Sequence, residues 1–251
     1  MKAAQNLMAK VNRGDVVTGL LVMNHVWLEL IEISRNAGLD YLILDMEHGS
    51  PNVDMVVEMC AIGRMLDFPV LIRPVDHEMS TIRKAIDMGP CGFLLPTVQS
   101  AADLDKVRDA IYMPPRGQRR PGSRGNAWVS GLHLEAWQRD VEDHFIILPQ
   151  IETQRGLDNR AEIAGHEITT AMAHGPYDLS YDLGVGGAMS GPEVSAANKQ
   201  IQAAAHAAGK KMWVIGDGPA LRAQGYTFIC LGAPMGILGN ALKGMVSRTV
   251  A

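Results

Sequence analysis

Two carboxylates of this sequence, Glu152 and Asp178, each follow a short apolar run. About one strand–helix–strand unit separates them, so both are expected at the carboxyl ends of successive parallel strands. Two acids at that edge can share one hard divalent cation, because such cations prefer oxygen ligands. The spacing therefore predicts the skeleton of a metal-assisted enzyme site.

Other polar residues stand at the ends of other apolar runs, on the same predicted edge: Asp45, Glu47, His48, Arg73 and Gln150. An arginine can bind and polarise an anionic oxygen, and a histidine can transfer protons near neutral pH. Magnesium or manganese suits an all-oxygen site with open positions, whereas zinc more usually has His or Cys ligands. No H-E-x-x-H motif is present to indicate zinc.

Each of these residues also has a structural explanation. An acid after a strand is often a helix cap, as Glu152 could be, and Asp178 could simply begin a helix. His48 could be a hydrogen-bonded loop residue, and Arg73, which precedes a proline, could belong to a structural ion pair. It is the combination of residue types that points to chemistry.

Short, continuous apolar runs alternate with helical patterns, as expected of strands that are buried on both faces. The runs cover residues 16–23, 41–44, 70–72, 92–95, 145–148, 168–173, 212–215 and 228–231. The helical patterns cover residues 27–37, 53–65, 80–88, 101–111, 157–164 and 193–208, with Ser80 and Ser100 as expected caps. This order predicts a single-domain (β/α)₈ TIM barrel over residues 1–251. A doubly wound open sheet is the alternative, but no nucleotide-binding glycine motif follows any run.

The composition is that of an ordinary globular protein. With 251 residues, 47% hydrophobic and 20% charged, the chain can bury one substantial core. The formal net charge of −4 argues against nucleic-acid binding, which favours a basic surface. We find no apolar signal core or membrane-spanning stretch and expect no membrane partner. The separated Cys60, Cys91 and Cys230 predict reduced core thiols and a cytoplasmic location.

Residues 113–140 break the alternation of strands and helices. The segment is rich in Gly, Pro and Arg and is too long for a plain connection. It could be a solvated basic loop. It could equally be a lid, or an arm that meets a neighbouring subunit and binds anionic substrate.

Six ordered motifs resemble those of the HpcH/HpaI family of class II pyruvate aldolases, which includes the citrate lyase β-subunit branch. They are Leu-Ile-Leu-Asp-Met-Glu-His (42–48), Ile-Arg-Pro-Val (72–75), Ile-Asp-Met-Gly with Leu-Leu-Pro-Thr-Val (86–98), Tyr-Met-Pro-Pro-Arg-Gly-Gln-Arg (112–119), Pro-Gln-Ile-Glu-Thr (149–153) and Gly-Pro-Tyr-Asp-Leu-Ser (175–180). The motifs run through most of the chain and are specific together, although none is decisive singly.

The resemblance implies a barrel whose last helix swaps between subunits, in a hexamer built as a trimer of dimers. It implies that Glu152 and Asp178 bind Mg²⁺, Mn²⁺ or Co²⁺ and that Gln150 lies beside bound pyruvate. It also implies that Arg73 stabilises the enolate oxygen that forms when the carbon–carbon bond breaks.

The same resemblance implies that His48, supported by Asp45, transfers protons. Glu47 and Asp87 also match motif positions near the site. An imidazole near its ordinary pKa can remove the substrate hydroxyl proton directly or through a water. No lysine stands at the end of a predicted strand, so no competing Schiff-base residue is expected.

The chain departs from the family pattern beside Asp178. Tyr177 replaces a small residue at a place where a backbone amide normally helps to hold the pyruvate carboxylate, so Pro176 and Tyr177 are expected to contact substrate. His174 stands in a position that usually carries Val or Ile, and it could either touch substrate or pack behind the strand. These changes leave the acid pair intact and bear on the substrate.

The residues and the resemblance together predict reversible, metal-dependent cleavage of a 4-hydroxy-2-oxo acid to pyruvate and a semialdehyde or sugar-derived aldehyde. One alternative is a relative that decarboxylates an oxaloacetate-like acid or cleaves an acyl-CoA. Another is a non-catalytic protein that binds metal and oxo acid. The intact His48 argues against the second alternative, because a binding protein has little need for an acid–base group.

Overall fold

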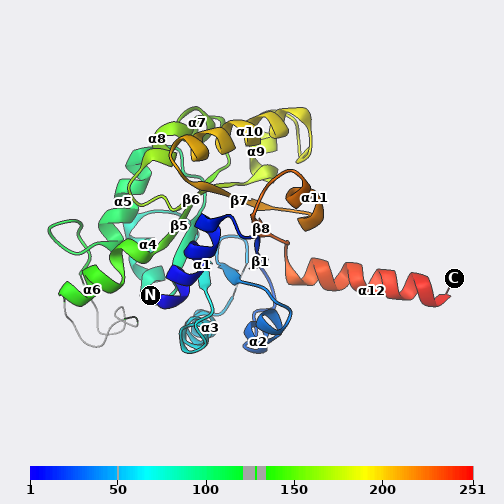
Figure 1. Ribbon diagram of the computed structural model, residues 1–251, viewed down its shortest axis with the longest axis horizontal. Coiled ribbons are helices and arrows are strands. Elements are labelled where there is room, and N and C mark those ends of the chain that lie inside the picture. The colour runs from blue at the N-terminus through cyan, green and yellow to red at the C-terminus, as the bar shows by residue number, and fades with distance from the viewer. Residues whose placement is uncertain (50, 121–127, 129–133, 251) are drawn as a thin grey trace.

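The computed structural model describes residues 1–49, 51–120, 128 and 134–250. Parallel strands form a closed barrel in chain order (Figure 1). They are β1 (Val17–Val22), β2 (Tyr41–Asp45), β3 (Val70–Arg73), β4 (Gly92–Leu95), β5 (Ile146–Ile151), β6 (Ala171–His174), β7 (Lys211–Ile215) and β8 (Phe228–Cys230). The barrel closes where Val17 pairs with Phe228. The predicted barrel is confirmed and the open sheet is excluded.

The barrel interior is a packed core. The Tyr41 hydroxyl donates a hydrogen bond to the Ile229 carbonyl (2.9 Å) and accepts one from Trp213 Nε1 (2.8 Å). Gly19 of β1 makes room for this ring, since a Cβ there would lie 2.5 Å from it. These contacts tie β2, β7 and β8 together inside the barrel. The strands are apolar on both faces because one face packs in this core and the other against the helices.

Helices alternate with the strands, and all but the last lie around the barrel (Figure 1). They are α1 (Lys2–Arg13), α2 (Glu29–Asn36), α3 (Val53–Met65), α4 (Met79–Ile86), α5 (Ala101–Ile111), α6 (Leu134–Asp140), α7 (Gln154–Asp158), α8 (Arg160–Gly165), α9 (Pro176–Asp182), α10 (Pro192–Ala207), α11 (Gly218–Ala223) and α12 (Pro234–Val250), with a 3₁₀ turn η1 (Glu142–His144). Helices α3 and α5 match their predicted ranges. The range 157–164 instead divides into α7 and α8.

The two predicted serine caps do not act as caps. Helix α4 begins at Met79, so Ser80 lies inside it and Glu78 holds the cap position. Ser100 does precede α5, but its hydroxyl donates to Asp103 (3.1 Å) and accepts no backbone N–H. Both helices are short, and each buries one apolar face, so tertiary packing stabilises them without a side-chain cap.

Helix α1 lies beside the amino ends of β2 and β3. It buries Ala4, Leu7 and Val11, and its Lys10 pairs with Asp40 just before β2 (2.7 Å). The second Asp40 oxygen accepts the backbone N–H of Thr18 on β1 (2.9 Å). The amino end of the barrel is therefore closed by structural contacts.

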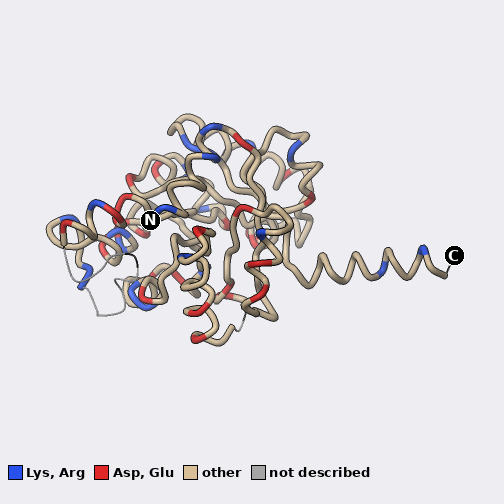
Figure 2. The backbone as a smooth tube through the Cα atoms, turned by 60° about the horizontal axis from the view of Figure 1, so that its bottom comes forward, with Lys and Arg blue, Asp and Glu red and all other residues tan. Residues whose placement is uncertain are grey.

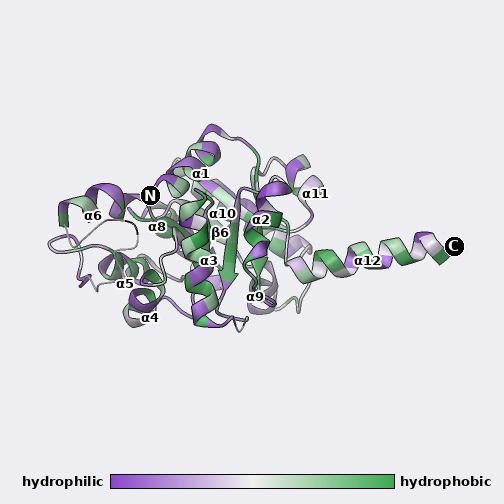
Figure 3. Ribbon diagram, turned by 90° about the horizontal axis from the view of Figure 1, so that it is seen from below, coloured by the Kyte–Doolittle hydropathy of each residue, from purple (hydrophilic) through white to green (hydrophobic). Residues whose placement is uncertain are grey.

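The last helix, α12, extends away from the barrel (Figure 1) and buries none of its residues in this chain. Figure 2 shows very few charged positions along it, and Figure 3 shows repeated apolar turns. Its exposed apolar side chains are Met235, Ile237, Leu238, Leu242, Met245, Val246 and Val250. No helix within the described ranges is both long enough and apolar enough to span a bilayer.

The described parts of segment 113–140 lie near the amino end of β4. Arg116 pairs with Asp143 (2.7 Å) and stacks on Tyr112. Trp128 Nε1 donates to the Pro90 carbonyl (2.9 Å). These parts do not cover the carboxyl end of the barrel, so they do not form a lid over it. Positions 121–127 and 129–133 lie outside the described residues.

The cysteines are free and buried, as predicted. Burial raises the pKa of Cys91 and Cys230 to about 12, and it also raises that of Cys60. All three are therefore protonated core residues at neutral pH.

Candidate active site

The carboxyl ends of the strands surround a hollow of about 430 Å³. Its lining comes from the connections after β2, β4, β5 and β6: Glu47, His48, Thr97, Glu152, Thr153, Asp178, Tyr181 and Asp182. Both predicted metal ligands and the predicted proton-transfer histidine are among them. Catalytic groups of TIM barrels gather at this end of the strands.

Glu152 reaches the hollow because of the strand register and a glycine. Ile151 of β5 pairs with His174 of β6, which sets Glu152 level with Gly175. A Cβ at Gly175 would lie 2.6 Å from both Gln150 Nε2 and Glu152 Cγ. Only a residue without a side chain lets Gln150 and Glu152 share this edge.

Asp178 stands in the first turn of α9, just past β6. The helix-start interpretation of this residue is thus correct as local structure. The carboxylate nevertheless lines the hollow, as does Glu152. A negative group is also stabilised at this place by the helix dipole.

The acids of the hollow affect one another. Burial, and then the charges of Glu47 and Asp178, raise the pKa of Glu152 to about 8. Arg73 and a hydrogen bond from Thr97 act in the opposite direction. Glu152 is only 4% exposed, so its repulsion from the other carboxylates is weakly screened by water. A bound cation would relieve it.

The donor set fits a hard divalent cation. Glu152 Oε1 and Gln150 Oε1 are buried, and within the described residues neither accepts a hydrogen bond. Orphaned buried oxygens are costly unless a ligand satisfies them. The described residues contain no cluster of three or more His, Cys, Asp or Glu side chains placed to hold a metal. Two carboxylates with further positions left to water and substrate are what Mg²⁺ commonly uses.

Asp45 and Arg73 form a buried ion pair across β2 and β3. They are opposite each other in the strand register. Arg73 Nε donates to Asp45 Oδ1 (2.8 Å), and Nη2 donates to Oδ2 (2.6 Å). Burial alone would lower the pKa of Arg73, but the bond to Asp45 and the charges of Asp45, Glu47 and Glu152 raise it. Arg73 is a fixed cation beside the hollow, because its Nε lies 3.2 Å from Oε2 of the lining residue Glu47.

The ring of His48 has a different neighbour from the one predicted. Asp45 Oδ1 accepts the backbone N–H groups of Glu47 (3.0 Å) and His48 (3.4 Å), so it shapes the loop. The imidazole Nε2 lies 3.6 Å from Glu47 Oε2. Within one chain Asp45 therefore orients Arg73, and Glu47 is the carboxylate beside the ring. Burial raises the pKa of Glu47, against the lowering effects of Arg73 and His48.

Thr97 is a site residue that sequence reasoning missed. Its φ is 51°, a left-handed conformation that costs a β-branched residue about 1–2 kcal/mol. The preceding Pro96 carbonyl is 3.1 Å from His77 Nδ1, and His77 Nε2 is 3.3 Å from Asp103 Oδ1. The loop is thus held so that Thr97 reaches Glu152. The sequence feature that could have predicted this role is a hydroxyl residue just past the carboxyl end of β4.

The residues predicted to contact substrate stand next to residues that line the hollow but do not line it themselves. Gln150 is buried in β5, two residues before Glu152. Pro176 and Tyr177 open α9, and the Tyr177 ring faces outward, 53% exposed. Tyr181, one turn further on, lines the hollow itself. The aromatic residue at the site is therefore Tyr181, held by Tyr177.

His174 is a packed residue, not a substrate contact. Its Nδ1 lies 2.9 Å from Asn198 Oδ1, and its Nε2 accepts the Ile215 N–H (3.3 Å). Burial lowers its pKa to about 4, which keeps the ring neutral. His174 thus joins β6, β7 and α10.

Asp87 is not brought to the site within one chain. It follows α4, which returns the chain to the amino end of the barrel. Its carboxylate pairs there with Arg119 Nη2 (3.2 Å), and the Arg119 guanidinium also stacks on Trp137.

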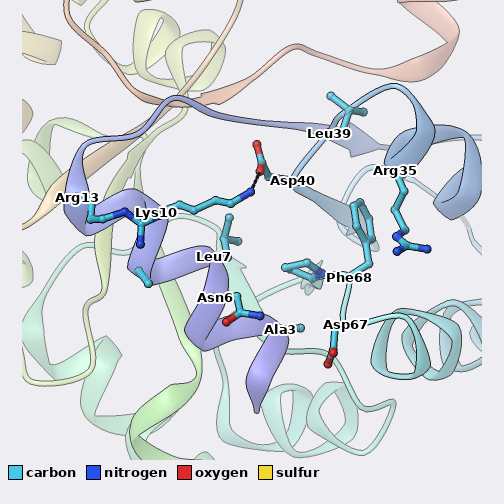
Figure 4. A pocket seen from close by; sticks show the side chains of 12 residues that line it. Ala3, Asn6, Leu7, Lys10, Arg13, Arg35, Leu39, Asp40, Asp67 and Phe68 are labelled. Atoms are coloured by element: carbon cyan, nitrogen blue, oxygen red, sulfur yellow. Dashed lines mark hydrogen bonds and ion pairs between the residues drawn. The ribbon is translucent and has the colours of Figure 1, made fainter.

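A second hollow of about 430 Å³ lies at the amino end of the barrel, beside α1 (Figure 4). It contains the Lys10–Asp40 pair, and its place at the amino end indicates a structural role.

Known proteins resemble this chain in both sequence and fold. The chain is 29% identical over 226 residues to the hydroxypyruvate/pyruvate aldolase of Chromohalobacter salexigens, covering 86% of this chain and 87% of the relative. It is 30% identical over 244 residues to the 2-keto-3-deoxy-L-rhamnonate aldolase of Shigella boydii, covering 93% and 88%. The crystal structure of an HpcH/HpaI aldolase from Desulfitobacterium hafniense superposes with a TM-score of 0.87 at 24% identity, covering 97% and 96%.

A family model also matches the chain. It spans residues 24–241, which include every strand from β2 to β8 and the whole candidate site. This match and the similarity to the Shigella relative confirm the resemblance found in the sequence. The chain belongs to the HpcH/HpaI aldolase/citrate lyase family.

Proposed function

We propose that this protein is a divalent-metal-dependent pyruvate aldolase, which reversibly cleaves a 4-hydroxy-2-oxo acid to pyruvate and an aldehyde. The observation that carries the proposal is that the acid pair Glu152 and Asp178 lines one hollow, while the fixed cation Arg73 lies close enough for its charge to act on Glu152. The aldolase names of the curated relatives support the reaction class.

Glu152 and Asp178, with Gln150 beside them, would hold Mg²⁺, Mn²⁺ or Co²⁺. Such a cation, when bound, supplies Lewis-acid polarisation of the keto acid and orients it. The unpartnered oxygens of Glu152 and Gln150 support this assignment. Gly175 keeps both side chains at the edge of the hollow.

Arg73 would stabilise the negative charge that develops on the enolate oxygen of pyruvate. Asp45 occupies its Nε and Nη2 and holds the guanidinium plane still, which leaves Nη1 for substrate. A charge that is already oriented needs no reorganisation during the reaction, and such groups commonly contribute a factor of about 10²–10³ to the rate.

His48 would take the proton from the substrate hydroxyl during cleavage and return it during aldol addition. Its side chain is 50% exposed, so it can exchange this proton with solvent. Glu47 Oε2, 3.6 Å from the ring, would stabilise the imidazolium. General acid–base groups of this kind contribute a factor of about 10²–10⁴.

A lactate dehydrogenase assay for released pyruvate tests the proposal with a panel of 4-hydroxy-2-oxo acids and added Mn²⁺. We expect turnover that depends on the cation and collapses in His48→Ala, while Mn²⁺ binding persists. Oxaloacetate decarboxylation or acyl-CoA cleavage without aldol cleavage would favour the other enzyme class. Mn²⁺ binding without any turnover would favour a binding protein.

We also propose that α12 mediates self-association, in the hexamer expected from the family. Its apolar side chains, Met235, Leu238 and Leu242 among them, lie exposed and would be covered by another copy. Sedimentation of the full chain, compared with Leu238→Lys/Leu242→Lys, tests this. A wild-type monomer would contradict it.

The free, buried cysteines support the further proposal that the protein has a cytoplasmic location, where thiols stay reduced.

A further inference from the structure

An aromatic pair stands beside Asp178 on α9. The rings of Tyr177 and Tyr181 meet edge to face, with centroids 5.1 Å apart and planes at 64°. Their hydroxyl oxygens are 3.4 Å apart. Tyr181 is 56% exposed although it lines the hollow, so its ring offers an open apolar face next to the acid pair. Edge-to-face pairing with Tyr177 holds that face in one place.

The hollow itself carries an excess of negative charge. Its lining includes the carboxylates of Glu47, Glu152, Asp178 and Asp182. Lys and Arg are absent from its lining within the described residues. Arg73, whose charge reaches Glu152, is already paired with Asp45 and Glu47.

The charge balance stays negative when the site is loaded. A divalent cation would offset two of the carboxylates, and the pyruvate carboxylate would restore one negative charge. An aldehyde that carries a second carboxylate would then enter a field of its own sign, which opposes binding. Asp182 adds to this field on the side of Tyr181, since both lie at the end of α9 and line the hollow.

We infer that the aldehyde partner of this enzyme is uncharged and that its carbon skeleton packs on the ring of Tyr181. The inference rests on the proposed aldolase function and names its substrate class. In the synthetic direction, C3 of the pyruvate enolate supplies the electron pair for the new bond to the aldehyde carbon. The C3 proton that pyruvate loses when the enolate forms passes to neutral His48. As the carbonyl π bond of the aldehyde opens, its oxygen takes this proton from His48, so atoms and charge balance.

Two aldehydes of equal length test the charge: butanal, which is neutral, and 4-oxobutanoate, which is anionic. Deuterium exchange at pyruvate C3 with Mn²⁺ and no aldehyde is measured first, because it reports the pyruvate half alone. With exchange present, we expect kcat/KM for butanal to exceed that for 4-oxobutanoate by at least about tenfold. Equal or reversed values would overturn the inference. A lack of exchange would contradict the proposed function, and the inference with it.

A substitution in the hollow tests whether its negative charge causes the preference for butanal. Asp182→Asn removes one charge but keeps an oxygen that can accept the Gln154 N–H, so the preference for butanal should narrow several-fold. Asp15→Asn is the matched control, because Asp15 pairs with Arg13 outside the site and should leave the preference unchanged. An unchanged preference in Asp182→Asn would overturn the electrostatic part of the inference.

Packing of the aldehyde on the Tyr181 ring is tested separately. Tyr181→Leu should raise KM for butanal several-fold with a smaller effect on kcat, while Tyr181→Phe should keep the wild-type KM. The non-reacting alcohols butan-1-ol and 4-hydroxybutanoate give a second readout by saturation-transfer NMR. Only butan-1-ol should bind, and Tyr181→Leu should weaken it. An unaltered KM together with unaltered butan-1-ol binding would overturn the role of Tyr181.

Discussion

Asp45 and Arg73 face each other at the carboxyl ends of β2 and β3, and one guanidinium binds both carboxylate oxygens. The same carboxylate accepts the backbone N–H groups of Glu47 and His48. A single buried acid thereby fixes the arginine and the loop that carries the histidine. Asp45 therefore positions both Arg73, which is proposed to stabilise the enolate charge, and the loop of His48, which is proposed to transfer protons.

Arg73→Lys should abolish most of the activity while the fold remains. A lysine cannot make two parallel bonds to Asp45, and its charge would not be held in the guanidinium plane. We expect kcat to fall by about 10²–10³ with little change in Mn²⁺ affinity. Arg13→Lys, at an exposed ion pair with Asp15, is the control. Wild-type kcat in Arg73→Lys would contradict the assigned role.

Gly175→Ala should weaken cation binding. The new methyl group would lie within 2.6 Å of Gln150 and Glu152 side-chain atoms and would push the ligands apart. We expect the Kd for Mn²⁺ to rise at least about tenfold, because metal ligands must stand close to their ideal geometry. Gly165→Ala is the matched control, since nothing lies within 4 Å of its added Cβ. Calorimetric titration of both variants checks the difference, and equal Kd values would count against it.

Cation binding should strengthen with pH up to about 8. Glu152 must lose its proton to act as a ligand, and its pKa is raised from 4.5 to about 8. Below that value the apparent Kd for Mn²⁺ should rise by about tenfold per pH unit. Titrations at pH 6, 7 and 8 measure this. A Kd that does not vary over that range would contradict the environment assigned to Glu152.

The same group links stability to pH in the cation-free protein. The folded state keeps a proton on Glu152 that the unfolded state releases above pH 4.5. The stability from this group is fully present below pH 4.5 and is lost as pH rises through about 8. Mn²⁺ should therefore raise Tm more at pH 8.5 than at pH 6, which thermal unfolding at both pH values checks.

His174 should make the protein acid-sensitive. Its pKa is lowered from 6.5 to about 4, so between these pH values His174 binds a proton in the unfolded state and stays neutral in the folded state. The stability from this group is present above pH 6.5 and should fall by about 2 kcal/mol between pH 7 and pH 5. His174→Gln should be less stable at neutral pH but should lack this dependence. Urea unfolding of both proteins at each pH separates them, and parallel curves would contradict the prediction.

The barrel could be predicted from sequence because its strands are buried on both faces and so appear as continuous apolar runs. All eight strands overlap those runs, although β5 continues past its run to Ile151. The site could be predicted in part because parallel strands bring their carboxyl ends together, which placed Glu152 and Asp178 in one hollow. Strand order alone is enough for that step.

Other features depend on geometry that residue types do not specify. The partner of Asp45 follows from the register of β2 against β3, which sets Asp45 opposite Arg73. Asp87 belongs to a sequence motif that was expected near the site, but it follows α4 and so lies at the amino end of the barrel, away from the hollow. Thr97 reaches Glu152 only through a left-handed backbone conformation, which composition rarely predicts for a β-branched residue.

The most direct test of the central claim is exchange of the pyruvate C3 protons for deuterium, followed by NMR in the presence and absence of Mn²⁺. Enolate formation alone produces this exchange, and it needs no knowledge of the aldehyde. We predict exchange that requires Mn²⁺ and is lost in Glu152→Gln and in Arg73→Lys. Exchange that proceeds without the cation, or that survives in Glu152→Gln, would contradict the claim that these residues form a metal-assisted enolate site.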